Sequence, residues 1–481
     1  MLPVLTPSQM SAVDAAATEH VEVLIGRAAG AVARLALQMM GGTYGRRVVV
    51  VAGPGNNGND GRVAAELLRR RGAKVLVHDV ASAPEVLEPA DLVIDAAFGT
   101  GFRGSYSFPD PDGAPVLAVD IPSGISGVTG VAFGSPAKAA ATVTFAALKP
   151  GLLLGDGPAF AGEVVVSDIG LDVRDPDVVG AATCSLVADA DVLAWVPTRS
   201  HDDHKWRHAV WVLGGSPGMT GAPALCSAAA LRSGAGYVRL SIPGSADQRE
   251  VAVPVSPPVA AGAPGAPGAP VEAVVVAVSG DGWAADVAAD DRRFGCIAIG
   301  PGLGRRSEVV DQVRAALVSS STPIVLDGDG LWAISEAPID ALAARATVHG
   351  VTAPTVLTPH DGEFELLTGA PPGDDRIAAA RSLAASTGAV VLLKGPTTVV
   401  AEPAGEVALV RSGDARLATA GTGDVLTGTI SALIASGASP WHAAAAGAHL
   451  HGRAAMLGPP HGMIASDVAA LLPDAWASLG D

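Results

Sequence analysis

Hydrophobic residues in the first part of the chain follow two periods, which predict strands that alternate with helices. Short β-branched runs at residues 46–52, 74–79 and 92–96 indicate buried strands, and the amphipathic segment 63–71 indicates a helix. Strands in alternation with helices pair in parallel and carry their ligand site at the strands' carboxyl ends. The pattern therefore predicts a doubly wound α/β sheet. Its further strands are predicted at residues 116–121, 142–145 and 163–166.

A helical segment is predicted before this sheet. Thr6, Pro7 and Gln9 have the pattern of a capping box, in which a threonine hydroxyl and a glutamine side chain satisfy N–H groups at a helix start. A helical pattern follows to about Leu37. We therefore expect the chain to begin with a helix.

The alternation of strands and helices repeats after a polar break at residues 197–207. Because 481 residues exceed one ordinary core, we place a domain boundary there and expect two α/β domains, residues 1–198 and 199–481. Gly-Ala-Pro repeats at residues 254–270 predict a flexible surface loop inside the second domain. The strands predicted in that domain are 209–213, 237–242, 296–299, 324–326, 390–393 and 398–401.

Composition narrows the class of protein. With 49% hydrophobic and 16% charged residues the chain can bury large cores, and its net charge of -17 argues against a nucleic-acid partner. Cys184, Cys226 and Cys296 have no metal-site spacing, which is typical of a reduced, intracellular protein. There is neither a signal-peptide pattern nor an apolar run of membrane-spanning length. We expect a cytoplasmic protein with no membrane partner.

The first glycine-rich loop matches a dinucleotide-binding pattern. Gly53, Gly55 and Gly58 give the G-x-G-x-x-G spacing, and Asp79 ends the next predicted strand, where such folds contact a ribose. The loop is also rich in Asn and Asp, whose oxygens could hold a hydrated nicotinamide ring or a hard cation. A turn rich in Asn and Gly for backbone reasons alone is the third interpretation.

Two more polar loops follow apolar strands. One begins at Asp95 and runs to Ser105, and the other begins at Asp120 and contains Ser123. Because the carboxyl ends of parallel strands share one edge of a sheet, we expect these loops to converge with Asn57. Each Asp could also simply cap its loop.

The motifs GPGNNGNDG, DAAFGTG and VDIPSG together resemble the N-terminal domain of the NAD(P)H-hydrate repair enzymes, over nearly all of residues 1–195. The resemblance implies a Rossmann-like domain that epimerises the hydrated cofactors NADHX and NADPHX, with Asp120 assisting the reaction. It implies K+ held by Asn57, Asp95 and Ser123. Asn59 departs from the family, which usually has Gly there. The implied substrate contacts are Asn56, Asn57, Gly58, Asn59, Asp60, Gly99, Thr100, Gly101, Phe102, Arg103, Gly104, Ser105 and Asp120.

A second set of loops follows the strands of the second domain. The most informative is Thr419 to Asp424, where small residues open a helix that can bind an anion, and Asp424 can take a proton from a hydroxyl. This arrangement is typical of phosphoryl transfer. Five other strand-end loops share that pattern, at residues 212–222, 300–304, 326–331, 357–364 and 393–398.

This set resembles the ribokinase-like dehydratase domain of the same family over roughly residues 200–481. The resemblance implies catalysis by Asp424, with NAD(P)HX contacts from Ala222, Gly302, His360 and Asp424. It implies ADP contacts from Lys394, Gly395, Pro396, Thr397, Thr398 and Gly423, with Mg2+ accompanying the nucleotide. Two positions depart from the family, Trp206 in place of a glycine after the His-Lys pair and Gly328 in place of the commoner alanine.

The resemblance as a whole implies a bifunctional enzyme that interconverts R- and S-NAD(P)HX and dehydrates S-NAD(P)HX to NAD(P)H at the expense of ADP, giving AMP and phosphate. We expect it to form a homo-oligomer. The alternative is a ribokinase-like small-molecule kinase fused to a nucleotide-binding Rossmann domain.

Several polar residues have competing interpretations. Lys149 matches a family segment or is a surface lysine, and Lys394 contacts phosphate or ribose or is a plain strand-end lysine. His360 hydrogen-bonds a carboxamide or a neighbouring acid. The His201-Asp202-Asp203-His204 run is expected to be a solvated linker, and His449 and His451 are expected to pack or be exposed rather than bind a metal.

Overall fold

The computed structural model of the protein describes residues 1–181, 183–245, 268–349 and 353–480. By its contacts the chain divides into Leu2–Cys184 and a second unit of Met1 with Ser185–Asp481. Residues 185–198, which the sequence analysis assigned to the first domain, contact the second unit. The reason is that β10 (Cys184–Leu186) lies next to β19 (Val407–Val410) in the second unit's sheet. Most of the predicted loop at residues 254–270 falls outside the described residues.

The first unit is built on a six-stranded parallel sheet with the order β3-β2-β4-β6-β8-β9. Its central strands, β2 and β4, are neighbours from which the chain winds in opposite directions, so the switch point lies at their carboxyl ends. The doubly wound order predicted from the sequence is confirmed. The strands are β2 (Arg47–Ala52), β3 (Lys74–Asp79), β4 (Leu92–Ala96), β6 (Val116–Val119), β8 (Ala141–Phe145) and β9 (Glu163–Ser167).

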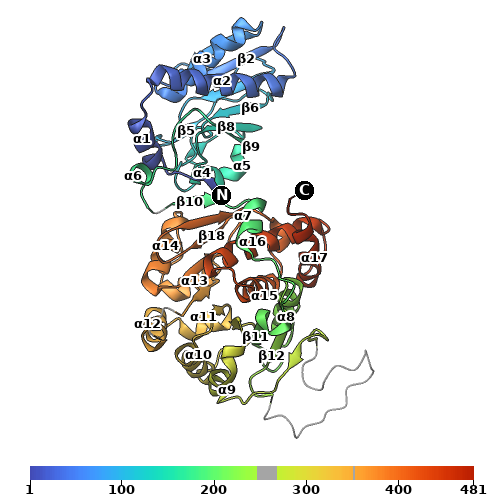
Figure 1. Ribbon diagram of the computed structural model, residues 1–481. Coiled ribbons are helices and arrows are strands. Elements are labelled where there is room, and N and C mark those ends of the chain that lie inside the picture. The colour runs from blue at the N-terminus through green and yellow to red at the C-terminus, as the bar shows by residue number, and fades with distance from the viewer. Residues whose placement is uncertain (182, 246–267, 350–352, 481) are drawn as a thin grey trace. The chain divides into compact units, whose positions relative to one another are not determined.

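Helices α2 (Val21–Met40) and α3 (Asn56–Arg70) lie side by side on one face of this sheet (Figure 1). The opposite face packs against aromatic side chains of the strand-end loops, among them Tyr106 and Phe108. The pair β5 (Tyr106–Ser107) and β7 (Gly134–Ser135) stands in those loops. Short helices complete the unit, α4 (Pro150–Leu153), α5 (Gly157–Ala161) and α6 (Pro176–Val179).

The sequence analysis predicted one helix at the N-terminus, where the structure has two. The capping box is present at the start of α1 (Pro7–Ala16), where Thr6 and Gln9 bond each other's backbone N–H groups at 3.0 and 3.3 Å. A break after Ala16 separates α1 from α2, which begins at Val21. The two helices therefore enter the unit separately, and the segment between them faces a pocket described below.

Helix α2 also corrects the expectation about apolar runs. Among the described residues it is the one helix long and apolar enough to cross a membrane by length and composition. Its buried residues, which include Ala28, Val32 and Ala36, lie in the core that α2 shares with α3 and the sheet. It is accounted for as a core helix of the first unit.

The second unit holds a larger sheet in which seven neighbouring strands are parallel. Their order is β17-β16-β15-β14-β11-β12-β13, and β18 and β19 extend the sheet antiparallel beyond β17. The strands are β11 (Ala209–Leu213), β12 (Tyr237–Ser241), β13 (Val274–Val275), β14 (Cys296–Ile299), β15 (Ile324–Leu326), β16 (Thr355–Leu357), β17 (Val390–Leu393) and β18 (Thr398–Ala401). Of these strands, β13, β16 and β19 are additional to those predicted.

Apolar helices cover one face of this sheet, where α8 (Gly221–Arg232), α15 (Thr422–Ala435), α16 (Pro440–Leu457) and α17 (Ala465–Ala477) share one core (Figure 1). Helix α7 (Asp189–Trp195) packs against α16. The other helices of the unit are α9 (Trp283–Asp290), α10 (Ser307–Ser319), α11 (Asp329–Ile334), α12 (Pro338–His349), α13 (Asp361–Thr368) and α14 (Arg376–Thr387).

Candidate active sites

The first glycine-rich loop is shorter than its sequence indicates. Helix α3 begins at Asn56, so the Asn-Asp stretch forms the helix's first turns rather than an open loop. The glycines permit close packing, because a Cβ on Gly53 would lie 1.8 Å from the Ala97 carbonyl oxygen and one on Gly58 would lie 1.9 Å from the Gly53 carbonyl oxygen. The backbone geometry therefore accounts for these glycines. Their close packing also fixes the start of α3, from which the polar side chains project.

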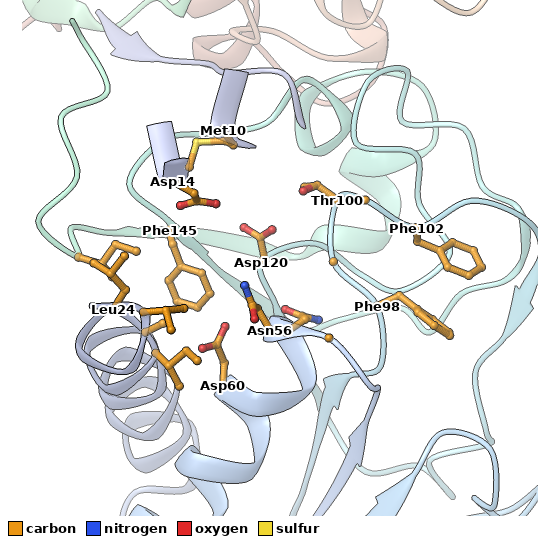
Figure 2. A pocket seen from close by; sticks show the side chains of 18 of the residues that line it. Met10, Asp14, Leu24, Asn56, Asp60, Phe98, Thr100, Phe102, Asp120 and Phe145 are labelled. Atoms are coloured by element: carbon orange, nitrogen blue, oxygen red, sulfur yellow. The ribbon is translucent and has the colours of Figure 1, made fainter. Parts of the chain in front are cut away.

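A pocket of about 540 Å³ lies at this end of the first unit (Figure 2). Eight of the predicted substrate contacts line it, namely Asn56, Asn57, Asp60, Gly99, Thr100, Gly101, Phe102 and Asp120. The predicted contacts Gly58, Asn59, Arg103, Gly104 and Ser105 are not among the lining residues. Asp79, whose place suggested a ribose contact, forms an ion pair with Arg62. The sequence analysis missed Asp14, Leu24 and Phe145, which also line the pocket.

Two tight turns at neighbouring strand ends shape the pocket. Asp120 has a φ of 66°, and the Ile121 N–H donates to the Val119 carbonyl at 2.8 Å, which closes a γ-turn. Ala146 repeats this geometry after β8, with a φ of 61° and a 2.7 Å bond from the Ala147 N–H to the Phe145 carbonyl. Such turns are rare and strained for residues other than glycine. The first ends the predicted strand 116–121 at residue 119 and presents Asp120 to the pocket.

Lys149 is not a surface residue. Its side chain is 2% exposed, and its ammonium group lies 2.6 Å from Asp120 Oδ1. The same group donates to Thr144 Oγ1 at 2.8 Å and to the Phe145 carbonyl at 2.9 Å. A buried ammonium with three oxygen partners is a fixed charge beside Asp120. The family match at Lys149 was the signal that could have placed it.

The predicted cation ligands meet beneath the pocket. Asp95 is fully buried and accepts hydrogen bonds from the Ser123 hydroxyl at 2.6 Å and the Ser123 N–H at 2.8 Å. Burial raises the pKa of Asp95 to about 6, although the bonds from Ser123 lower it. Asn57 lies beside Gly99, and its buried Nδ2 has no partner among the described residues, so its amide is free to turn an oxygen toward a cation. A buried carboxylate with hydroxyl and amide oxygens nearby fits a monovalent cation.

The second site lies where β15, β17 and the start of α15 meet. Asp327 follows β15, is 4% exposed, and accepts hydrogen bonds from Lys394 Nζ at 2.6 Å and from the Thr358 and Thr427 hydroxyls at 2.8 Å. Burial alone would raise the pKa of Asp327, but the Lys394 ammonium and the hydrogen bonds hold it below its usual value. Asp327 was missed by the sequence analysis, although the motif around it was noted.

Lys394 is more than a strand-end lysine. Its ammonium group lies 3.9 Å from Glu363 and 3.4 Å from where a Cβ of Gly423 would stand. Asp327 and Glu363 raise the pKa of Lys394 against the opposing effect of burial. A charged amine therefore reaches the first turn of α15, where helix N–H groups also attract anions. This arrangement can bind a phosphate.

Asp424 stands in that first turn, three residues after Gly421, whose φ of 91° precedes the helix start. Burial and then the charge of Asp327 raise the pKa of Asp424 to about 7, although Lys394 lowers it. A carboxyl that titrates near neutral pH can act as a general base toward a hydroxyl. The remaining predicted contacts lie around this turn in two groups.

Ala222 and Gly302 form one group, since the Ala222 methyl lies 3.3 Å from a Cβ position at Gly302. Leu225, one turn further along α8, lies 2.6 Å from a Cβ position at Gly421, so α8 packs against the start of α15. The Pro359–His360 loop forms the other group, because the Lys394 N–H donates to the Pro359 carbonyl at 2.9 Å. Residues Gly395, Pro396, Thr397 and Thr398 continue from Lys394 into β18.

His360 caps helix α13 and also lies beside an acid, because its backbone N–H donates to Glu363 Oε2 at 3.0 Å and its Nε2 lies 3.6 Å from the same oxygen. Its Nδ1 accepts hydrogen bonds from the N–H groups of Gly362 and Glu363 at 3.0 and 3.3 Å. The hydrogen of the neutral ring is therefore on Nε2, and the side chain is 61% exposed. An exposed Nε2–H at this place can donate to a carbonyl of a bound ligand.

Two further histidines, His208 and His449, have structural partners. Asp203 bonds His208 at 2.9 Å and Arg207 at 2.7 Å, so the polar linker forms a local network. His449 is buried and bonds Ser412 and Asp189 at 2.8 and 2.6 Å, which fits the expected packing role. Among the described residues there is no group of three or more His, Cys, Asp or Glu side chains that could hold a metal ion.

Fold and sites together define the class of protein: a two-site α/β enzyme with an acidic pocket in one unit and, in the other, a buried carboxyl group in the first turn of a helix beside an ion-paired lysine. A family model described as NAD(P)H-hydrate dehydratase matches residues 210–472, and one described as YjeF-related protein N-terminus matches residues 21–88 and 78–151. The chain belongs to the bifunctional NAD(P)H-hydrate repair enzymes, and the predicted fold class is confirmed.

Relatives match most of the chain. A bifunctional NAD(P)H-hydrate repair enzyme from Mycobacterium leprae is 39% identical and aligns with 90% of this chain and 89% of its own length. The enzyme of that name from Salinibacter ruber is 35% identical over 98% of this chain and 95% of its own length. The structure of an ADP/ATP-dependent NAD(P)H-hydrate dehydratase from Bacillus subtilis, co-crystallized with ATP and Mg2+, is 32% identical, with a TM-score of 0.49, and covers 61% of this chain and 98% of that one.

Proposed function

We propose that the first unit interconverts R- and S-NAD(P)HX and that the second dehydrates S-NAD(P)HX to NAD(P)H at the expense of ADP, giving AMP and phosphate. The observation that carries this proposal is family membership across both halves of a chain that has a distinct acidic site in each. The kinase alternative would need a stable phosphorylated product, whereas relatives that align with nearly the whole chain are repair enzymes.

In the dehydratase site, Asp424 would take the proton of the ring hydroxyl as its oxygen attacks the terminal phosphoryl group of ADP. The N–H groups of Gly421 to Gly423 and the Lys394 ammonium would stabilise the negative charge that develops on the phosphoryl oxygens. The ring then loses phosphate, a far better leaving group than hydroxide. Mg2+ would enter with the nucleotide, which usually supplies most of its ligands together with water.

In the epimerase site, Asp95, Ser123 and Asn57 would hold K+. Bound there, it would supply a positive charge beside buried Asp95, while the Ser123 hydroxyl, which accepts a hydrogen bond from the Phe98 N–H, holds the loop that carries Phe98 to Phe102 beside the pocket. Asp120, the lining residue with a fixed ammonium partner, would act on the substrate hydroxyl. The three cysteines are all buried, which is compatible with the cytoplasmic location that we propose. A homo-oligomer remains a prediction.

The test supplies a mixture of NADHX epimers and follows the return of reduced-nicotinamide absorbance with ADP, with ATP and with neither. We expect complete recovery with ADP, because epimer exchange feeds the S form into the dehydratase. Recovery of half of the mixture would show dehydration without exchange. No recovery with either nucleotide would contradict the proposal, and a stable phosphorylated product would favour the kinase.

A further inference from the structure

Three aspartates, one glutamate (Glu19) and one lysine line the pocket of the first unit. Asp14 reaches it from α1, Asp60 from α3, and Asp120 from the γ-turn after β6, and their side chains point into the same space (Figure 2). Lys149 lines the same pocket. Asp120 has a proposed role in epimerisation. Asp14 and Asp60 can also carry a proton, but no role in proton transfer has been given to them.

Asp120 and Lys149 form a fixed pair. Lys149 is 2% exposed, and its three N–H donors are matched by Asp120, Thr144 and the Phe145 carbonyl. Thr144 also donates to Asp120 Oδ1 at 3.1 Å. An ammonium and a hydroxyl therefore both donate to the same oxygen of Asp120. This fixed carboxyl group is placed to accept a proton from a substrate hydroxyl.

Asp60 has the opposite surroundings. It is 7% exposed and forms no ion pair within the described part of the chain. The charged groups facing it across the pocket are Asp14 on α1, Asp120, Glu19 between α1 and α2, and Lys149, which is bound to Asp120. Burial first, and then the charges of Asp120 and Asp14, raise the pKa of Asp60 to about 8. At neutral pH Asp60 holds a proton.

We propose that Asp60 and Asp120 are an acid–base pair for epimerisation, with Asp60 as the proton donor, Asp120 as the acceptor, and Lys149 as a positioning residue for Asp120. This inference rests on the epimerase function proposed for the first unit. It deepens that function by giving a catalytic role to Asp60, which was expected only to contact the substrate.

The chemistry needs one acid and one base at the same moment. The hydroxylated carbon of the hydrate is bonded to the ring nitrogen. Asp120 takes the hydroxyl proton, the O–H electrons form a C=O bond, and the C–N bond breaks. The electron pair of that bond stays on nitrogen, which takes the proton from Asp60. After rotation, nitrogen adds to the other face of the carbonyl and both protons return, so the step needs neither oxidant nor added water.

The test follows epimer exchange from one purified NADHX epimer by chromatography. No nucleotide is present, so that dehydration does not take place. The full-length protein is assayed from pH 5 to pH 10, after subtraction of spontaneous exchange. We expect the wild-type rate to fall above about pH 8, where Asp60 loses its proton. Asp60→Asn should lower the rate by at least about 100-fold and remove the alkaline decline, since general acids contribute roughly that much.

Matched variants separate the roles. Glu66→Gln, on the exposed side of the same helix, should leave both rate and pH profile unchanged. Lys149→Met should lower kcat with KM within about threefold, because Asp120 loses the ammonium group that holds its carboxyl group in place. Lys149→Arg should recover part of kcat, a response that a merely structural lysine would not give.

The outcomes distinguish this inference from the proposed function. Absence of epimer exchange in the wild-type protein would contradict the epimerase function itself. Exchange by the wild type, with Asp60→Asn within threefold of it and the alkaline decline retained, would overturn the acid–base pair. If Asp60→Asn fails to fold, the wild-type profile decides, because a rate that stays flat between pH 7 and pH 10 would also overturn it.

Discussion

Each site has a buried carboxyl group whose pKa lies near neutral pH. Asp60 and Asp424 lie in different units, yet burial is the largest cause of the raised pKa at each, and a neighbouring Asp is the second. Each of those neighbours, Asp120 and Asp327, is paired with a lysine. The same physical arrangement, a proton-holding Asp beside an ion-paired Asp, therefore occurs twice in one chain.

The first prediction concerns Asp424. Asp424→Asn should lower ADP-dependent dehydration by about 100-fold to 10,000-fold, because the amide cannot accept the hydroxyl proton. Epimer exchange should be unchanged, since Asp120 and Asp60 lie in the other unit. Nicotinamide absorbance and epimer chromatography measure the two activities separately. Loss of both would contradict two independent sites.

A second prediction uses Asp60 as a reporter of stability. Its pKa in the folded protein is about 8 against an ordinary value of 3.8, so between these values the folded state binds the proton that the unfolded state releases. Its contribution to stability is present below about pH 4 and is lost as pH rises toward 8, by at most about 1.4 kcal/mol per pH unit.

Denaturant unfolding from pH 5 to pH 8 should therefore show a smaller loss of stability in Asp60→Asn than in the wild type. Glu66→Gln is the control, because Glu66 is exposed on the same helix. Parallel pH dependences of the wild type and Asp60→Asn would refute the assignment of this proton.

At the scale of secondary-structure elements, strand positions followed from the sequence, and strand endings did not. Periodicity predicted β2 and β4 to within one residue, because buried parallel strands are continuous apolar runs. It predicted an extra two residues in β6 and one helix in place of α1 and α2. Those endings depend on a positive φ at Asp120 and on a break after Ala16, which hydrophobic periodicity does not encode.

The site residues also divide into those that the sequence predicted and those that it did not. Motifs found the residues that stand on strand-end loops, such as Asp120, Lys394 and Asp424. They missed Asp14, which comes from a helix, and Asp327, whose importance arises from long-range contacts with Lys394 and Thr427. Burial of Lys149 likewise depends on its ion pair with Asp120, which lies 29 residues earlier in the chain. Such long-range pairs cannot be read from a single sequence.

The γ-turns give a third prediction. Ala146 has a φ of 61°, where a β-branched side chain is far more strained than alanine and glycine is not strained. Ala146→Val should destabilise the protein by about 2 kcal/mol or more, whereas Ala146→Gly should stay within about 1 kcal/mol of the wild type. Chemical denaturation measures both. Equal stability of the two variants would show that the turn relaxes.

At the scale of the whole molecule, the two activities are linked through a common substrate. The chain divides into two compact units, each with its own acidic site, and the reaction of one supplies the epimer that the other consumes. A fourth prediction follows if that epimer diffuses freely. A mixture of Asp120→Asn and Asp424→Asn should repair both epimers completely with ADP, although neither variant alone does.

Coupled absorbance assays at several enzyme concentrations measure this complementation, with each variant alone as the control. The rate of the mixture should approach that of the wild type as concentration rises. A mixture of the two variants that repairs only the S epimer would show instead that the epimer must pass within one molecule.

The pairing of lysine with aspartate also determines how the protein reacts with reagents that modify amines. The whole sequence has five lysines, Lys74, Lys138, Lys149, Lys205 and Lys394, and two of them are the ion-paired lysines of the two sites. A bonded ammonium is a poor nucleophile because its lone pair is occupied by a proton. Acylation of the folded enzyme should therefore stop at the other three lysines, and a label on Lys149 or Lys394 would report that its unit had opened.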